Sequence, residues 1–306
     1  MSLTKVDWLT FRTKSDVSKT VVNLKEAFGE AGGALNLKSR DRGWMGYEQS
    51  ADVCLGDMNV GLLAFGGDNQ RGWVSVSLSG RGCQWVGDWD EAQYSLKSLS
   101  SFEARRVDIA LDTFRREVTH DLVIDAYRNG MFTTAGRPPK MSQILPEEAS
   151  DGRTIYIGQR DQAKFLRAYE KGYELSNGLR KSGIDITHID GVPVSDIYRL
   201  ELELKPKNAP LPEDLIDRRD QYFSGAYPYL QKVVEVEPEI FHQSREKGPQ
   251  LDMEAALAQI RFQYGSTLFT ALSAHSGDVG AVWDKIVGNK HNQSLLEKGV
   301  LLVDHY

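Results

Sequence analysis

The stretch Arg105-Arg106-Val107-Asp108-Ile109-Ala110-Leu111-Asp112 alternates apolar and polar residues with a period of two. This alternation predicts a β-strand that buries its three aliphatic side chains on one face and presents its polar side chains on the other. Asp108 and Asp112 then lie on the same side of the strand. Two carboxylates on one strand face repel each other unless a positive group lies between them. The stretch is therefore either a half-solvated edge strand or a strand that presents acids to a ligand.

A second segment, residues 199–205 (RLELELK), repeats this pattern. Its leucines predict a buried face, while Glu201 and Glu203 share the polar face with a cation at each end. Ordinary cross-strand charge pairing accounts for such a segment on its own. Two neighbouring strands that each present paired carboxylates are more specific, because oxygen ligands then converge as Mg²⁺ or Mn²⁺ requires.

The third informative segment is residues 154–174 (TIYIGQRDQAKFLRAYEKGYE), where Arg167, Tyr169 and Lys171 are expected on one strand face. Flanking cations lower the cost of a phenolate and also bind phosphates. A tyrosine on a strand often only packs, but this arrangement makes Tyr169 a candidate nucleophile toward phosphodiester phosphorus. Tyr173, four residues on, is a possible second nucleophile if the segment is helical, although Gly172 argues against a helix there.

The remaining sequence predicts an α+β fold with a mixed or antiparallel sheet and flanking helices. Glycine-punctuated β-rich runs over residues 29–87 predict antiparallel hairpins. A proline-rich run at 206–212 breaks the pattern and suggests a catalytic domain over 1–205 and a helical DNA- or partner-binding domain over 206–306. Within that second part, helices are expected at 213–223, 227–234, 253–273, 277–287 and 292–298.

Composition excludes several classes of protein. The chain of 306 residues is 41% hydrophobic and 26% charged, has no apolar run of membrane-spanning length, and has no secretory signal pattern. Cys54 and Cys83 form no C-x-x-C pair, so we expect neither a disulfide framework nor a structural zinc site. The net charge of −6 argues against uniform coating by nucleic acid, but residues 151–181, with seven basic and four acidic side chains, allow one local groove.

Several of these motifs together resemble a known family. The order VDWLTF, SGRGC, RRVDIALD, TIYIGQR with FLRAYEKGYE, and RLELELK is similar to the replication initiation factor family, and FQYGSTLFTAL in the helical tail resembles its phage branch. That family comprises rolling-circle initiators of filamentous phages and the initiators and relaxases of certain plasmids and integrative elements. The resemblance implies a DNA nickase and strand transferase that uses a tyrosine and a divalent metal.

Position by position, the resemblance places Tyr169 on the tyrosine of the family pattern R-x-Y-[DE]-K, Asp108 on the aspartate of R-h-D and Glu201 on the glutamate of R-h-E. It implies Mg²⁺ or Mn²⁺ at Asp108 and Glu201, with Asp112 and Glu203 as additional or outer ligands. The six histidines are scattered singly, with no His-hydrophobic-His pair, so a metal would be held mainly by carboxylates.

The implied reaction is attack by Tyr169 on a phosphate at the replication origin, leaving a 5′-phosphotyrosine bond and a free 3′-hydroxyl. Arg167 and Lys171 would stabilise the charge on pentavalent phosphorus. The expected partners are origin DNA, single-stranded at the nick, a host helicase and polymerase, and a second copy of the chain, with no membrane and with action in the bacterial cytoplasm. The residues expected to bind DNA are Arg106, Arg160, Lys164, Arg199 and Lys205.

Other interpretations stay open. A conjugative relaxase would use the same chemistry, a DNA-binding regulator would share the fold without catalysis, and a hydrolase of sugars would use the carboxylate pairs. The aromatic residues Trp44, Trp73, Trp85 and Trp89 either stack on unpaired bases or cover the sheet.

Overall fold

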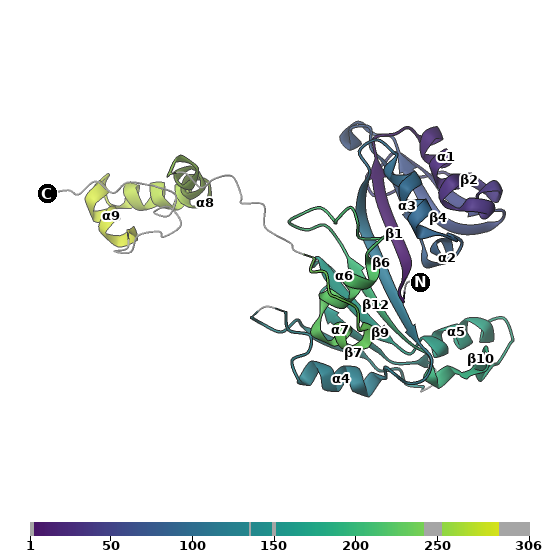
Figure 1. Cartoon of the computed structure of the whole chain (residues 1–306). Coiled ribbons are helices and arrows are strands. Elements are labelled where there is room, and N and C mark those ends of the chain that lie inside the picture. The colour runs from purple at the N-terminus through teal and green to yellow at the C-terminus, as the bar shows by residue number, and fades with distance from the viewer. Residues whose placement is uncertain (1–2, 135, 149–150, 242–252, 288–306) are drawn as a thin grey trace. The chain divides into compact units, whose positions relative to one another are not determined.

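Figure 1 shows a computed structural model of the chain, which describes residues 3–134, 136–148, 151–241 and 253–287. The chain divides into two compact units, Met1–Gln243 and Ser244–Tyr306, which are described separately. Within the described residues, no helix combines the length and the apolar character that crossing a membrane requires.

The first unit is built on a ten-stranded sheet in the order β2-β3-β4-β5-β1-β6-β12-β9-β8-β7. Every neighbouring pair in it is antiparallel, which confirms the predicted α+β class with an antiparallel sheet. The strands are β1 (Lys5–Thr13), β2 (Leu35–Arg40), β3 (Gln49–Leu55), β4 (Met58–Phe65), β5 (Val74–Leu78), β6 (Glu103–Thr113), β7 (Met141–Ile144), β8 (Thr154–Gly158), β9 (Lys164–Tyr169) and β12 (Tyr198–Leu204). A separate two-stranded sheet pairs β10 (His188–Ile189) with β11 (Val192–Pro193).

Helices border this sheet (Figure 1). Four of them begin at polar side chains that accept a hydrogen bond from the first turn: Asp16, Ser79, Asp88 and Thr119. The helices of the first unit are α1 (Val17–Ala27), α2 (Gly80–Cys83), α3 (Trp89–Lys97), α4 (His120–Arg128), α5 (Lys171–Arg180), α6 (Arg219–Ala226) and α7 (Pro228–Val234).

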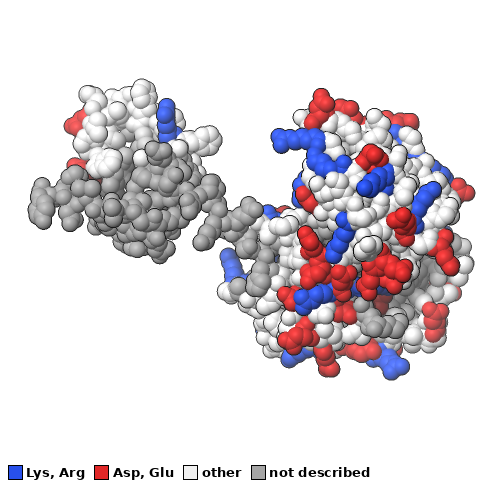
Figure 2. Space-filling view, turned by 45° about the horizontal axis from the view of Figure 1, so that its top comes forward, with Lys and Arg blue, Asp and Glu red and all other residues white. Residues whose placement is uncertain are grey.

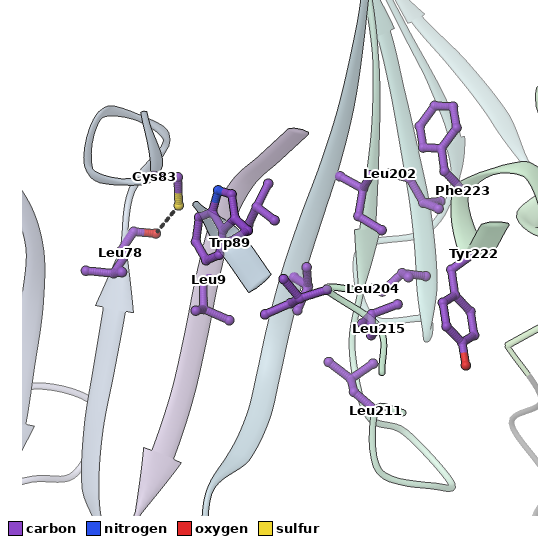
Figure 3. Packing of buried hydrophobic residues seen from close by; sticks show 14 of the residues in the cluster. Leu9, Leu78, Cys83, Trp89, Leu202, Leu204, Leu211, Leu215, Tyr222 and Phe223 are labelled. Carbon is purple, nitrogen blue, oxygen red and sulfur yellow. Dashed lines mark hydrogen bonds between the residues drawn. The ribbon is translucent and has the colours of Figure 1, made fainter. Parts of the chain in front are cut away.

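The two decisive stretches lie next to each other, because β6 contains residues 105–112 and pairs directly with β12. As the alternation predicts, the aliphatic residues of both strands are on the core side, where Ile109 and Leu202 are fully buried. Figure 3 shows how Leu202 and Leu204 pack beside residues of the following segments, including Leu211 and Phe223. The opposite face of the sheet therefore carries the polar side chains that can meet a ligand.

The predicted domain boundary after residue 205 is too early, because the next segments belong to the core of the sheet. Leu215, Phe223 and Leu230 are almost completely buried in the same hydrophobic cluster as the strands. The unit ends instead after Gln243. The proline run and the change to helical periodicity correctly predict local structure, but neither feature reveals which core a helix packs against.

The second unit contains the helices α8 (Met253–Ala274) and α9 (Val279–Ile286), close to the predicted ranges. The helix expected at 213–223 begins later, at Arg219, after a series of turns. The helix expected at 292–298 lies outside the described residues.

Candidate active site

Tyr169 and Glu201 meet on the polar face of the sheet. The Tyr169 hydroxyl donates a hydrogen bond to Glu201 Oε2 at 3.1 Å. In the antiparallel register of β9 and β12, Arg167 lies opposite Glu201, and its guanidinium bonds to Glu201 Oε1. Glu201 is almost fully buried, so its carboxylate is held by a phenol on one side and a guanidinium on the other.

Asp108 and Glu203 extend this cluster onto β6. They lie directly opposite each other in the strand register, and Arg106 Nη2 lies 2.6 Å from Asp108 Oδ2 and 3.0 Å from Glu203 Oε2. Arg167 Nη2 lies 3.4 Å from Asp108 Oδ2. Three buried carboxylates are thus bridged by two arginines, which offset the repulsion that the sequence pattern implies.

Asp112 belongs to a different group of charges. Arg199 donates to Asp112 Oδ2 at 2.8 Å and to Asp7 Oδ1 at 3.0 Å, and Lys5 Nζ lies 2.6 Å from Asp112 Oδ2. Four residues along a strand separate Asp112 from Asp108 by about 13 Å. The structure therefore does not bring Asp112 together with the other predicted metal ligands.

Burial sets the protonation of this site. It raises the pKa of Glu201 to about 7, against the opposing effect of Arg167, and Asp7 and Asp108 raise it further. Burial also raises the pKa of Asp108, opposed mainly by Arg106. The pKa of Tyr169 is raised as well, first by burial and then by the charge of Glu201. The expectation that flanking cations ease ionisation of this phenol is therefore wrong for its net pKa.

These groups open into a cavity of about 490 Å³ that is predominantly polar. Tyr169, Glu201 and Arg167 form part of its wall, and β1, α2, β8 and α5 supply the rest. Figure 2 shows acidic and basic side chains interspersed on one face of the first unit. The residues contributed by the other elements include Asp7, Arg81, Gln84, Tyr156 and Lys171.

Comparison with known proteins places the chain in a family. The sequence model for replication initiation factors matches residues 103–268, more than half of the chain. The chain belongs to the replication initiation factor family. This confirms the resemblance that the sequence motifs indicate. The matched segment contains the strands of Asp108, Tyr169 and Glu201.

A search of solved structures finds a rolling circle replication initiator protein from Geobacillus stearothermophilus with 21% sequence identity and a TM-score of 0.48. The match covers 66% of this chain and 74% of that chain. A search of curated proteins finds no significant match.

Arg81 lies outside the matched segment, yet it lines the cavity of this replication initiation factor. The tight turn α2 holds it there: a Cβ on Gly82 would lie 2.3 Å from the Val60 carbonyl oxygen, so only glycine lets the turn pack against β4. Arg81 is exposed and has no ion pair among the described residues. The other three cations of the cavity, Arg167, Lys171 and Arg199, are each paired with a carboxylate.

Lys171 is positioned by a helix start and not by a strand. Its neighbour Gly172, in the first turn of α5, lies so close to Val194 that a Cβ would lie 2.0 Å from the carbonyl oxygen there. Lys171 Nζ lies 2.7 Å from Glu174 Oε1 and 5.6 Å from the centre of the Tyr169 ring. Tyr173 is also in α5 but does not line the cavity, so of these two tyrosines the structure brings Tyr169 to the carboxylates.

The predicted DNA-binding residues fall into different places. Arg106 and Arg199 are held by the carboxylate clusters, and Lys205 donates to the carbonyl of Arg160 while also contacting Glu203. The Arg160 guanidinium lies 5.6 Å from the centre of the Phe165 ring, on the face that carries Arg167 and Tyr169.

Lys164 lies on the opposite face of β9 from Arg167 and Tyr169. Its Nζ donates to the Ala226 carbonyl and lies over the Tyr227 ring at 4.3 Å. Burial there lowers the pKa of Lys164 to about 8. The charge surplus of the segment therefore does not correspond to one continuous surface.

The carboxylates present a donor set of the right type for Mg²⁺ or Mn²⁺, but their arrangement does not fit a metal ion. The guanidinium groups of Arg106 and Arg167 bond to the oxygens of Asp108, Glu201 and Glu203 that a metal would need. Among the residues that the structure describes, no three Asp, Glu, His or Cys side chains are grouped to hold a metal ion.

Proposed function

We propose that this replication initiation factor begins rolling-circle replication by nicking DNA at an origin and later rejoining it, with Tyr169 as the nucleophile. The observation that carries the proposal is the hydrogen bond from the Tyr169 hydroxyl to Glu201, a carboxylate whose pKa is near neutrality, at the wall of an open cavity. A nucleophile in contact with a base whose pKa lies near the working pH is the arrangement that phosphoryl transfer to tyrosine needs.

The raised pKa of Tyr169 assigns a role to Glu201. Because the phenol keeps its proton at neutral pH, attack requires a base that removes this proton as the bond to phosphorus forms. Glu201 Oε2 accepts it, the Tyr169 oxygen bonds to phosphorus, and the bond from phosphorus to the 3′-oxygen breaks. The 3′-oxygen takes a proton from water and becomes the primer end for a polymerase. Reversal by a 3′-hydroxyl releases Tyr169 and closes the strand without ATP.

The cations of the cavity would neutralise the phosphate. Arg81 is available for this task because no carboxylate of the described chain pairs with it, and Lys171 is paired only with the exposed Glu174. Arg167 also lines the cavity, where its pairing with Glu201 and Asp108 fixes a further positive charge. Preorganised donors of this kind stabilise charge that develops in the transition state.

The requirement for a divalent metal stays a prediction from the sequence, and no step above depends on it. Binding of Mn²⁺ can be followed by electron paramagnetic resonance with the wild type and with Asp108→Asn. If the predicted site forms, Mn²⁺ binds the wild type and is lost from Asp108→Asn. Equal signals from free Mn²⁺ in both samples would show that no metal binds and that Arg106 and Arg167 stay paired with these carboxylates.

The proposal extends to partners. We propose that the substrate is origin DNA, single-stranded at the nick, in the cytoplasm of a bacterial host, and that a host helicase and polymerase continue synthesis. Residues 244–306, which lie outside the sheet unit, would recognise the origin or one of these partners. A second copy of the chain would assist the rejoining step.

Covalent capture tests the proposal even where the sequence of the origin is unknown. The protein is incubated with a pool of randomised single-stranded oligonucleotides and with Mg²⁺ or Mn²⁺, and DNA that stays attached after denaturation is recovered and sequenced. We expect attached DNA of a shared sequence with the wild type and none with Tyr169→Phe. Absence of attached DNA from the wild type would contradict the nickase proposal, and a regulator that only binds DNA would then remain.

A further inference from the structure

A second hollow lies on the polar face of the same sheet, beside the cavity of Tyr169. Its volume is about 340 Å³, within the range of small-ligand sites. Trp8 and Trp44 form two of its walls, and Trp8 also lines the Tyr169 cavity. The two depressions are therefore adjacent.

Small residues create this hollow. Its lining includes Gly61 on β4, Ser77 on β5 and Ser79 directly after β5, which fill little of the space above the sheet. Trp8 is held beside this floor by its indole N–H, which donates to Thr10 Oγ1 at 3.0 Å, and by the Arg106 guanidinium at 4.7 Å from its ring centre. The result is a fixed aromatic wall next to an open space.

Trp44 comes from the connection between β2 and β3, the two strands that also supply Arg40 and Asp52 to the hollow. Its carbonyl accepts a hydrogen bond from the Tyr47 N–H at 3.0 Å, and its side chain is half-buried. The other aromatic residues singled out from the sequence have different roles. Trp89 is buried in the core, and Trp73 lies under the cations of Arg12 and Lys14.

The remaining wall is polar and carries both donors and acceptors. Arg40 and Asp52 line it as a loose ion pair at 3.8 Å, and Asn59 adds an exposed amide. Aromatic walls combined with hydrogen-bonding groups of both kinds match an unpaired nucleobase, which has two flat faces and an edge of donors and acceptors.

The location also matches a strand of DNA. Between β9, which carries Tyr169, and β1, which carries Trp8, lie only β12 and β6, so the separation is three interstrand steps or about 14 Å. Ser79 lines the hollow, and the next residues, Gly80 and Arg81, line the Tyr169 cavity. A single strand that places a phosphate near Arg81 can therefore place a neighbouring base in the hollow.

We propose that the hollow between Trp8 and Trp44 binds an unpaired base of the same DNA strand, a few nucleotides from the phosphate that Tyr169 attacks. This inference rests on the proposed function and adds a base-binding site to it. The site is built from residues before position 103, outside the segment that the family model matches. It gives this part of the chain a direct role in holding the substrate.

The test uses the full-length protein and equilibrium binding of a fluorescently labelled single-stranded oligonucleotide of mixed sequence. Trp44→Ala changes a side chain outside the strands, and Trp85→Ala is the control because Trp85 is an exposed tryptophan that lines neither depression. Loss of one stacked base corresponds to a Kd about 5- to 150-fold higher. We expect this rise for Trp44→Ala and an unchanged Kd for Trp85→Ala.

A scan with single abasic positions, placed in an oligonucleotide recovered by covalent capture, sharpens the test. One abasic position should weaken binding to the wild type and should have no further effect on Trp44→Ala. The base site would be overturned if Trp44→Ala and the wild type bound the strand with equal affinity. It would also be overturned if Trp44→Ala lost as much affinity for duplex DNA as for single-stranded DNA. So would a mononucleotide that binds the wild type as tightly as the strand does.

Covalent attachment, measured in the same preparations, separates the two proposals. Trp44-dependent binding without any attachment to Tyr169 would leave the base site standing and remove the proposed chemistry. Attachment to Tyr169 with no effect of Trp44→Ala on Kd would leave the proposed chemistry standing and remove the base site.

Discussion

Tyr169 and Glu201 lie on neighbouring antiparallel strands, and the phenol hydroxyl donates a hydrogen bond to the carboxylate at 3.1 Å. This contact couples the protonation of the two groups, because the charge of Glu201 raises the pKa of Tyr169 while burial keeps Glu201 close to its own titration point at neutral pH. The reaction rate should therefore follow the ionisation of Glu201.

The first prediction concerns pH. Glu201 must be ionised to accept the phenol proton, so the rate of covalent attachment should rise with pH through about 7 and then level off. Glu201→Gln should be slower by about 100- to 10,000-fold at pH 8 and should lose this rise. Quenched time courses of adduct formation between pH 5 and pH 9 measure it. A wild-type rate that is flat across neutrality would contradict the assignment of Glu201 as the base.

The same pKa predicts how stability changes with pH. The pKa of Glu201 is 4.5 in the unfolded chain and about 7 in the folded protein, so the folded state binds more protons between these values. The contribution of Glu201 to stability therefore decreases as pH rises from 4.5 to about 7. The melting temperature of the wild type relative to Glu201→Gln should therefore fall across this window and stay constant above it. Differential scanning fluorimetry of both proteins gives the comparison, and a relative stability that rises with pH would contradict a raised pKa.

A further prediction tests Arg81 as a phosphate-binding residue. Arg81→Gln should weaken binding of single-stranded DNA and reduce the slope of log K against log salt by about 0.7, since one phosphate contact is lost. Arg81→Lys should restore much of the slope. Arg128→Gln is the matched control, because this exposed arginine lies on α4 and does not line the cavity. An unchanged slope in Arg81→Gln would place the scissile phosphate away from α2.

The domain boundary leads to a prediction about fragments. Residues 1–243 should fold with a cooperative thermal transition, whereas residues 1–205 should not. The shorter fragment lacks Phe223 and Leu230, which are fully buried against the sheet, and the loss of one such side chain alone costs about 2–5 kcal/mol. Circular dichroism during heating distinguishes the two fragments. A folded 1–205 fragment would show that α6 and α7 are dispensable.

The sequence predicts the central strands well, because a period of two determines both their structure and their buried face. That β6 and β12 are neighbours, and that Glu203 lies opposite Asp108, agrees with this reasoning. The same alternation places Tyr169 on the polar face of β9, and the pairing of β9 with β12 then brings it to Glu201. Local patterns thus contain most of the information about these three strands.

The remaining parts of the site depend on contacts that local patterns do not record. Strand β1 is inserted between β5 and β6, and this long-range pairing brings Asp7 and Trp8 to the site. Arg81 reaches the cavity through the close packing of Gly82 on β4. The sequence also does not predict that Arg106 and Arg167 neutralise the carboxylates, although both arginines lie on the polar strand faces that the alternation predicts.

The most direct test of the account identifies the residue that becomes attached to DNA. Wild-type protein is captured on its oligonucleotide, digested with nuclease and protease, and analysed by peptide mass spectrometry. We expect a nucleotide on the phenolic oxygen of Tyr169, and no adduct in Tyr169→Phe, whose binding of single-stranded DNA should stay near that of the wild type. Tyr173→Phe, the matched control, should form the adduct normally. A nucleotide found on Tyr173, on Tyr156 or on any other residue would contradict the assignment of Tyr169 as the nucleophile.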